Sequence, residues 1–245
     1  MNVAVVMPAF NEEEGIVEFM REILEAFAGH EARVVVVDDS STDRTAALVE
    51  DAAQQGFPAT VLRNVQNMGH GPSTLRALAA GVAAEADIII AVDGDGQFHG
   101  SDIAQIAVAL DTSGSDLVEG VRTGRNDPGY RRVVSALTRI LVRSACGVAP
   151  RDANTPLRAY RRSRLIELLE MIPSDAMTPN LLTSAIARRD SWHLLEIPVS
   201  SLARRGSSTV GSTWGASMAA LPSKHFVRFC WKSLKQWRRL RAVRA

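Results

Sequence analysis

Cysteine is scarce in this chain, which has two cysteines in 245 residues and no CxxC spacing of the kind that binds metals. Two cysteines cannot form the disulfide framework of a small secreted domain, so the composition favours a reducing compartment. Long apolar runs are missing too, and without a run of about 18 apolar residues the sequence predicts no transmembrane helix. Because Met1–Ala4 lacks the basic region of a signal peptide, we expect a cytoplasmic protein.

A net charge of one sign is also missing from the chain as a whole, since 28 basic and 27 acidic residues give +1. That balance argues against a polyanionic partner, but it is uneven along the sequence. Residues 224–245 hold eight basic residues and no acidic one, which leaves residues 1–223 with 20 basic and 27 acidic residues and a net charge of −7. The chain is therefore an acidic body with a strongly basic tail.

The basic tail at residues 224–245 also carries apolar side chains at near-helical spacing, among them Trp231 and Trp237. We predict a basic amphipathic C-terminal helix here, and helices of this kind bind membrane interfaces. Docking on the rest of the protein, a contact in a homo-oligomer and a nucleic-acid tail are the alternatives. We favour a peripheral position on the membrane surface and expect no nucleic-acid partner.

Short apolar runs alternate with amphipathic stretches over the first 120 residues. The runs predict strands at Val3–Met7, Val34–Val37, Thr60–Arg63, Ile88–Val92 and Leu117–Glu119. Helices are expected between them, with Asn11 as the N-cap of the first and Ser41 or Thr42 as the N-cap of the second. This alternation predicts an α/β fold whose mostly parallel central sheet is covered by helices on both faces. Ligands bind such sheets beyond the carboxyl ends of the strands.

The pattern changes after residue 120, where two Gly-, Pro-, Ser- or Thr-rich stretches predict loops at Val121–Gly129 and Arg204–Gly215. Arginines lie in or beside both loops, at positions 122, 125, 131, 132, 204 and 205. Any one of them fits a solvated surface charge, but together they favour a clamp for a diphosphate. Further helices are expected at Arg131–Cys146, Ser163–Met171 and Pro179–Arg189, with short strands at Pro156–Tyr160 and, at a sheet edge, His193–Leu202.

The sharpest local motif is Asp93-Gly94-Asp95-Gly96-Gln97, directly after an apolar run. In an extended stretch, residues 93, 95 and 97 point to the same side, so two carboxylates and an amide oxygen converge. Oxygen ligands of this kind suit Mg²⁺ or Mn²⁺. An EF-hand is excluded, because its sixth loop position would be Phe98 rather than glycine. The alternative is a solvated Asp-Gly turn, but the position after a strand favours the metal site.

Two weaker motifs follow other strands. Asp38 and Asp39 stand where an acidic residue commonly binds a ribose or a base edge, although a turn or capping role is equally compatible. Gly69-His70-Gly71-Pro72 precedes a helix, where glycines and helix amides can approach an anion, and a plain turn is the alternative.

Together these motifs resemble glycosyltransferase family 2, in particular its dolichyl/polyprenyl-phosphate mannosyltransferase-like branch. The matching segments follow the family order over about residues 3–210. They are Met7–Glu13 (MPAFNEE), Val37–Thr45 (VDDSSTDRT), Asn67–Gly71 (NMGHG), Asp93–Gln97 (DGDGQ), Gly120–Arg122 (GVR), and Asp152 followed by Arg158–Arg161 (RAYR).

The resemblance implies a GT-A fold at residues 1–223, with a nucleotide-binding half at 1–120 and an acceptor half at 121–223. It also implies a nucleotide-diphosphate sugar donor, a divalent metal and inversion at the anomeric carbon. The residues that it assigns to the nucleotide are Pro8, Phe10, Glu12, Asp39 and Asp93. Those that it assigns to the metal are Asp93, Asp95 and Gln97. Asp95, Arg122 and Arg131 would act at the phosphates, and Arg204 would be the arginine of the acceptor loop.

The expected reaction moves a sugar, mannose or glucose, from a GDP- or UDP-sugar to a polyprenyl phosphate at the cytoplasmic face of the membrane. One alternative is a soluble family member with a hydroxyl acceptor, which needs a general base such as Asp152. The other is a non-catalytic nucleotide-sugar binding module. The sequence departs from the family pattern at Thr155–Arg158, at Thr209 and around Pro179–Leu182, and these departures bear on the acceptor and the sugar rather than on the donor site.

Overall fold

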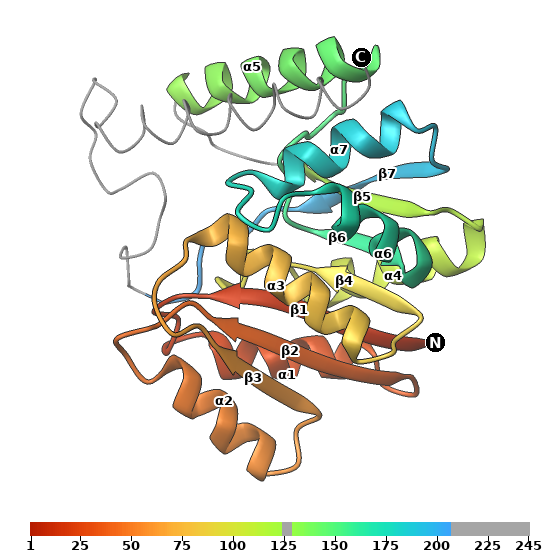
Figure 1. Ribbon diagram of the computed structural model, residues 1–245. Helices are drawn as coiled ribbons and strands as arrows, with labels where there is room; N and C mark the ends of the chain where they lie inside the picture. The colour runs from red at the N-terminus through yellow and green to blue at the C-terminus, as the bar shows by residue number, and fades with distance from the viewer. Residues whose placement is uncertain (124–128, 207–245) are drawn as a thin grey trace.

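The computed structural model describes residues 1–123 and 129–206, apart from the side chains of residues 129–134 (Figure 1). The first half contains β1 (Asn2–Ala9), α1 (Ile16–Ala26), β2 (Glu31–Asp38), α2 (Thr45–Gln54), β3 (Ala59–Arg63), α3 (His70–Ala83), β4 (Ile88–Ala91) and α4 (Gly100–Ser113). The second half contains β5 (Leu117–Thr123), α5 (Gly129–Cys146), β6 (Arg158–Arg161), α6 (Arg162–Met171), α7 (Pro179–Arg189) and β7 (Leu194–Ser200).

Seven strands form one sheet in the order β3-β2-β1-β4-β6-β5-β7. β6 runs antiparallel to β4 and to β5, and all the other neighbouring pairs are parallel. The predicted α/β fold with a mostly parallel sheet is confirmed. The carboxyl ends of the parallel strands therefore meet at one edge, where the reversed β6 begins.

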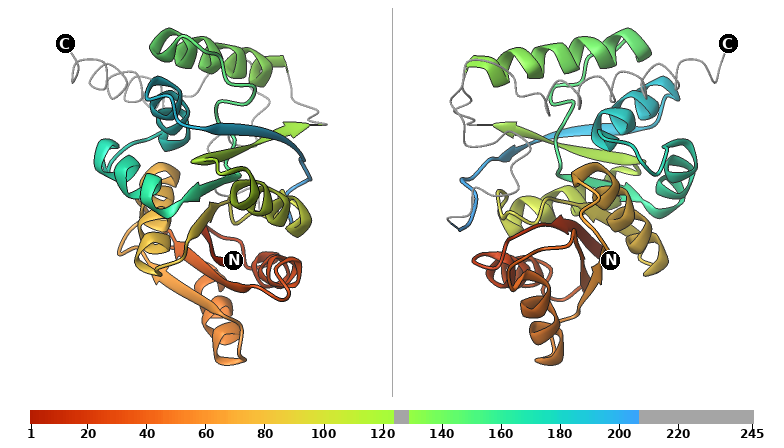
Figure 2. Two further views of the ribbon diagram at one scale, coloured as in Figure 1. Left: turned by 90° about the vertical axis from the view of Figure 1, so that its right-hand side faces the viewer. Right: turned by 60° about the vertical axis from the view of Figure 1, so that its left-hand side comes forward.

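Helices cover both faces of the sheet (Figure 2). Side chains of β1 alternate between the two faces, so that Val3, Val5 and Met7 belong to one core and Ala4 and Val6 to the other. The first core includes α1, α2 and α4, and the second includes α3, α5, α6 and α7. Apolar residues on both faces explain why the central strands read as continuous apolar runs.

The expected N-caps are wrong for the first two helices. α1 begins after Gly15, and α2 begins after Arg44. Asn11 instead adopts a left-handed backbone conformation with φ 55°, and its side chain accepts a hydrogen bond from the Thr42 amide. Asparagine tolerates this conformation better than most residues, and the loops it joins lie beside each other at the sheet edge.

Residues 121–123, predicted as the start of a loop, belong to a strand. β5 extends to Thr123, because residues Leu117–Thr123 pair in parallel with β7 at the sheet edge. Arg122 therefore lies in a strand. The predicted C-terminal helix at 224–245, Arg125, Thr209 and most of the loop at Arg204–Gly215 lie outside the described residues. Within the described ranges, no helix is long and apolar enough to cross a membrane.

Candidate functional site

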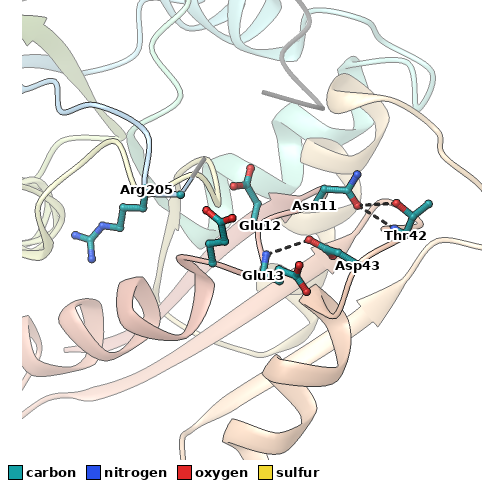
Figure 3. Close-up of a pocket in the computed structure, with 8 residues that line it drawn as sticks. Asn11, Glu12, Glu13, Thr42, Asp43 and Arg205 are labelled. Atoms are coloured by element: carbon teal, nitrogen blue, oxygen red, sulfur yellow. Dashed lines mark hydrogen bonds between the residues drawn. The ribbon is translucent and has the colours of Figure 1, made fainter. Parts of the chain in front are cut away.

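The loops that follow β1 and β2 are tied to each other at the carboxyl edge of the sheet (Figure 3). The Asn11 Oδ1 atom accepts from the Thr42 amide at 2.9 Å, and the Glu13 amide donates to Oδ2 of Asp43 at 3.1 Å. A pocket lies between these loops and the segment beyond β7. It is lined by Asn11, Glu12, Glu13, Glu14, Thr42, Asp43, Arg205 and Gly206. These hydrogen bonds hold together the loops after β1 and β2, two of the loops in which we expect ligand contacts.

The predicted nucleotide residues Pro8 and Phe10 frame the end of β1. Pro8 is buried within the strand, paired with Val37 of β2, and Phe10 is partly exposed just beyond the strand. Their placement at the edge agrees with the predicted site, and their contact with a nucleotide stays a prediction.

The Asp39 carboxylate is buried and accepts three hydrogen bonds. They come from Nδ2 of Asn64 at 2.6 Å, the Met68 amide at 2.8 Å and the Gly69 amide at 2.9 Å. Asp39 therefore anchors the segment that leads into α3, a role that the sequence did not indicate. Its neighbour Asp38 is also buried, and its Oδ1 atom has no hydrogen-bond partner in the described part of the chain.

Three carboxyl groups, of Glu12, Asp93 and Asp95, gather near the end of β4. Burial raises the pKa of Asp95 to about 7, and the charges of Asp93 and Glu12 raise it as well. Burial likewise raises the pKa of Glu12 to about 7, although the hydrogen bond and charge of Arg204 work in the opposite direction. Nε2 of His70 lies 3.6 Å from Oδ1 of Asp93. Carboxylates forced together in this way are stabilised by a cation.

The predicted metal set therefore fits Mg²⁺ or Mn²⁺ by its chemistry. Asp93 and Asp95 supply carboxylate oxygens whose repulsion a cation would relieve. Gln97 follows on the same loop, and its backbone amide donates to Oδ1 of Asp95 at 3.3 Å. Among the residues that the structure describes, no three His, Cys, Asp or Glu side chains are grouped to hold a metal ion. A cation here would need further oxygen ligands, which a bound diphosphate carries.

We expect the affinity for Mn²⁺ to rise with pH up to about 7, because the raised pKa of Asp95 makes metal compete with a proton. The apparent dissociation constant should fall about tenfold per pH unit below 7 and level off above it. The metal-free protein should lose stability as pH rises from the ordinary value of 3.8 through about 7, since the folded state favours the protonated carboxyl.

Thermal denaturation with and without Mn²⁺ across this pH range measures both effects. Asp95→Asn is the control for the metal-free measurement, because it has no proton to lose at this position. Equal Mn²⁺ affinity at both ends of the range would contradict the expectation.

Arg204 reaches the acidic group from the segment beyond β7. Its Nη2 atom lies 2.5 Å from Oε1 of Glu12, in a pair that is largely buried. The Leu202 amide donates to the carbonyl of Gln97 at 2.9 Å. The segment predicted to begin the acceptor loop is therefore joined to the predicted donor loop, and Arg204 and Glu12, which lie 192 residues apart in the sequence, are in contact.

Arg122 is held by Asp152 rather than directed at the acidic group. Its Nε donates to Oδ2 at 2.7 Å and its Nη2 to Oδ1 at 3.0 Å, and Nη2 also donates to the Asn154 carbonyl at 3.1 Å. Asp152, the candidate base for a hydroxyl acceptor, is thus the partner of a guanidinium. Arg131 lies in the first turn of α5, and its side chain is outside the described residues.

Sequence patterns missed a buried charged cluster around Glu119, on the same strand as Arg122. Glu119 lies between Arg158, at 2.6 Å, and Arg188, at 2.7 Å. Burial raises the pKa of Glu119, but the two guanidinium groups outweigh it and hold the pKa below its ordinary value. Arg158 also donates to the carbonyls of Ala153 and Thr155, so the cluster fixes the segment that carries Asp152. No local signal could reveal these pairs, because their members lie on β5, β6 and α7.

Comparison with known proteins finds relatives for most of the chain. The profile of glycosyl transferase family 2 matches residues 4–177. The undecaprenyl-phosphate 4-deoxy-4-formamido-L-arabinose transferase of Pseudomonas fluorescens (strain Pf0-1) is 34% identical over 203 residues, covering 80% of this chain and 56% of the relative. The protein of the same name from Edwardsiella ictaluri (strain 93-146) is 32% identical over 213 residues, covering 85% of this chain and 63% of the relative. The chain thus spans between half and two thirds of the length of these relatives.

Among solved structures, glucosyl-3-phosphoglycerate synthase from Mycobacterium tuberculosis, in complex with Mn²⁺ and uridine-diphosphate-glucose, matches with a TM-score of 0.59. The sequences are 22% identical, and the match covers 85% of this chain and 72% of that one. At this level of identity the likeness concerns the fold, and it agrees with the expected GT-A architecture.

Proposed function

Since the chain belongs to glycosyl transferase family 2, we propose that it is an inverting, metal-dependent glycosyltransferase that moves a sugar from a nucleotide-diphosphate sugar to a polyprenyl phosphate. The observation that carries the proposal is the gathering of Glu12, Asp93 and Asp95 with Arg204 at the carboxyl edge of the sheet. The branch is supported by the relatives, whose names give undecaprenyl phosphate as the lipid substrate.

In the proposed reaction an acceptor oxygen attacks the anomeric carbon while the bond to the diphosphate oxygen breaks. Asp93 and Asp95, with Gln97 on the same loop, would hold Mg²⁺ or Mn²⁺, which when bound neutralises charge on the departing diphosphate. Arg204 supplies a second positive charge beside them. Glu12, at the end of β1, would bind the nucleotide with Pro8, Phe10 and Asp39.

A phosphate acceptor suits this site better than a hydroxyl. A lipid phosphate is already anionic near neutral pH and needs no strong general base, whereas a hydroxyl does. The candidate base that the sequence offers, Asp152, is held in a bidentate pair with Arg122. Both carboxylate oxygens of Asp152 thus accept hydrogen bonds from the guanidinium, so the group is poorly placed to take a proton from a hydroxyl. The pair therefore favours the polyprenyl phosphate over a hydroxyl acceptor.

The direct test is transfer from GDP- and UDP-linked mannose, glucose and 4-deoxy-4-formamido-L-arabinose to undecaprenyl phosphate in vesicles, with Mn²⁺ present. We expect a lipid-linked sugar of inverted anomeric configuration from at least one donor. Transfer only to hydroxyl acceptors would favour the soluble alternative, and tight donor binding without transfer to any acceptor would favour the binding module.

We further propose that α5 lies on the cytoplasmic face of a membrane, together with the basic tail at 224–245. Leu137 and Ile140 are 58% and 62% exposed on this helix, beside the exposed Arg139 and Arg143. The sequence of α5 contains four arginines and no acidic residue. Exposed apolar side chains next to basic ones suit an anionic lipid surface.

Replacing both apolar side chains, in a Leu137→Asp and Ile140→Asp variant, should weaken binding to anionic vesicles about tenfold, since two apolar contacts are lost and two negative charges are placed against an anionic surface. Deleting residues 224–245 should abolish binding. The matched control is Val108→Asp, which alters an exposed apolar residue of α4. Co-sedimentation with vesicles measures the effect, and wild-type binding by both altered proteins would contradict the membrane assignment.

A further inference from the structure

We propose that Arg205 is a positioning residue, whose side chain fastens the segment carrying Arg204 to α1 and to the loop of Asp93–Gln97. Only its effect on sugar transfer rests on the proposed function. The fastening itself rests on contacts of described residues. Arg204 and Arg205 are neighbours with different tasks, because Arg204 pairs with Glu12 whereas Arg205 pairs with α1.

The Arg205 guanidinium contacts three residues of α1. It forms an ion pair with Glu22, lies 3.7 Å from Oε1 of Glu18, and stands over the ring of Phe19 at 5.2 Å from its centroid. Its side chain points away from Glu12 and Asn11 (Figure 3). An arginine with two carboxylates and an aromatic face loses little freedom on further ordering. Arg205 is thus built into the wall of the site and is not aimed at a diphosphate.

The backbone around Arg205 is bound to the predicted metal loop. The Arg205 amide donates to the Asp95 carbonyl at 3.0 Å, and its Nε donates to the Gly96 carbonyl at 3.4 Å. With the bond from Leu202 to Gln97, two amides of the segment are satisfied by carbonyls of the donor loop. Release of Arg205 from α1 would therefore loosen the acceptor segment first, because the donor loop keeps the hydrogen bond from the Gly94 amide to the Pro8 carbonyl at 3.2 Å.

Two glycines make room for this side chain. A Cβ atom on Gly15 would stand 2.7 Å from Cβ of Arg205, and one on Gly96 would stand 2.5 Å from its Cδ. Both distances are too short for real carbon contacts, so a side chain at either position would displace Arg205. Gly96 also has φ +68°, which favours glycine independently. The seat for Arg205 is consequently formed by the N-terminus of α1 and the donor loop together.

The consequence for function is preorganisation of Arg204. A guanidinium that must meet a phosphate works best when the backbone bearing it is already fixed. The anchor lies one residue away from Arg204 and engages α1 rather than Glu12. We therefore expect the loss of Arg205 to reduce transfer through the acceptor step while leaving the binding of the donor nucleotide largely intact.

The test compares Arg205→Ala and Glu22→Gln with Arg164→Ala in the full chain. Glu22→Gln keeps an oxygen for the Gly100 amide, which Oε1 of Glu22 accepts at 2.8 Å, and removes only the charge. Arg164 is the matched control, since it too pairs with two carboxylates, of Asp116 and Glu167, and stands 5.5 Å from the Trp192 ring centroid. Hydrogen exchange of the Leu202 and Arg205 amides reports the anchor directly.

Exchange at these two amides should quicken about tenfold in Arg205→Ala and Glu22→Gln, and should not change in Arg164→Ala. The turnover number should fall about tenfold, the KM for acceptor should rise, and the affinity for the nucleotide diphosphate should stay within about threefold. The turnover number of the double variant, Arg205→Ala with Glu22→Gln, should be no lower than that of Arg205→Ala alone, because both changes break the same ion pair. Arg205→Lys should restore part of the rate, since it keeps the charge but not the planar fork.

Unchanged exchange in Arg205→Ala, or additive losses in the double variant, would overturn the anchor. If the wild-type chain transfers no sugar but exchange quickens as expected, the anchor stands and the proposed function fails. If the wild-type chain transfers sugar but exchange in Arg205→Ala is unchanged, the proposed function stands and the anchor fails.

Discussion

Asp95→Asn should lower kcat/KM for sugar transfer by about a thousandfold or more, the largest kinetic effect expected of any single change in this chain. The substitution removes the negative charge on which cation binding depends, while keeping the shape of the side chain. The measurement is the initial rate of transfer with Mn²⁺ at about pH 8, where the carboxyl of the wild type is ionised, its pKa being about 7.

The same variant should be more stable than the wild type when no metal is present. At this pH the wild-type chain holds an ionised Asp95 against the charges of Asp93 and Glu12, and the amide removes that repulsion. The expected gain in the free energy of unfolding is about 1–2 kcal/mol, less than the full pKa shift implies because the open site admits water. Asp111→Asn, on the exposed side of α4, is the control for loss of a carboxylate. An Asp95→Asn protein that transfers sugar at a wild-type rate would show that the metal site lies elsewhere.

The largest loss of stability should come from Glu119→Gln. Glu119 is 1% exposed and accepts from both Arg158 and Arg188, so its neutralisation leaves two buried guanidinium groups short of a counter-charge. Removing one partner of a buried ion pair costs about 3–5 kcal/mol. The free energy of unfolding of a domain is about 5–15 kcal/mol in total, so this substitution would remove a large part of the protein's stability.

Urea denaturation measures this effect against a matched surface pair. Arg63 and Glu50 also lie 2.8 Å apart, but both side chains are about half exposed, and Glu50→Gln should cost less than about 1 kcal/mol. Similar midpoints for the Glu119→Gln and Glu50→Gln proteins would contradict the assignment of the cluster as a major support of the second half.

The sequence predicted those parts of the fold that depend on local pattern. Apolar runs placed the first five strands, and the short strands expected at Pro156–Tyr160 and His193–Leu202 correspond to β6 and β7. α7 has the predicted bounds, Pro179–Arg189. Pro198 correctly marked β7 as an edge strand, since proline cannot donate within a sheet interior. The motif at Asp93–Gln97 and the acidic residues of the first two loops do meet at one edge, as parallel topology requires.

Long-range partners were beyond the reach of local pattern. Arg204 follows Glu12 by 192 residues and Arg122 precedes Asp152 by 30, and no periodicity encodes such pairs. The predicted N-caps were wrong for a related reason. The side chain of Asn11 accepts a hydrogen bond from the Thr42 amide in the next loop, and such tertiary contacts override a local capping preference. Arg205 looked like one more surface arginine because Glu18, Glu22 and Phe19 are recognisable as its surroundings only once α1 is in place.

The reversed strand β6 has a consequence for the order in which the chain folds. β5 never pairs with β4, since β6 lies between them, so the apolar edge of β4 is uncovered until residues 158–161 have been made. During synthesis, more than 60 residues separate the completion of β4 from the strand that closes it. An open edge of Ile88-Ile89-Ile90 favours association with other chains, and such a delay slows closure because distant segments must meet. Folding yield should therefore depend on how fast β6 docks.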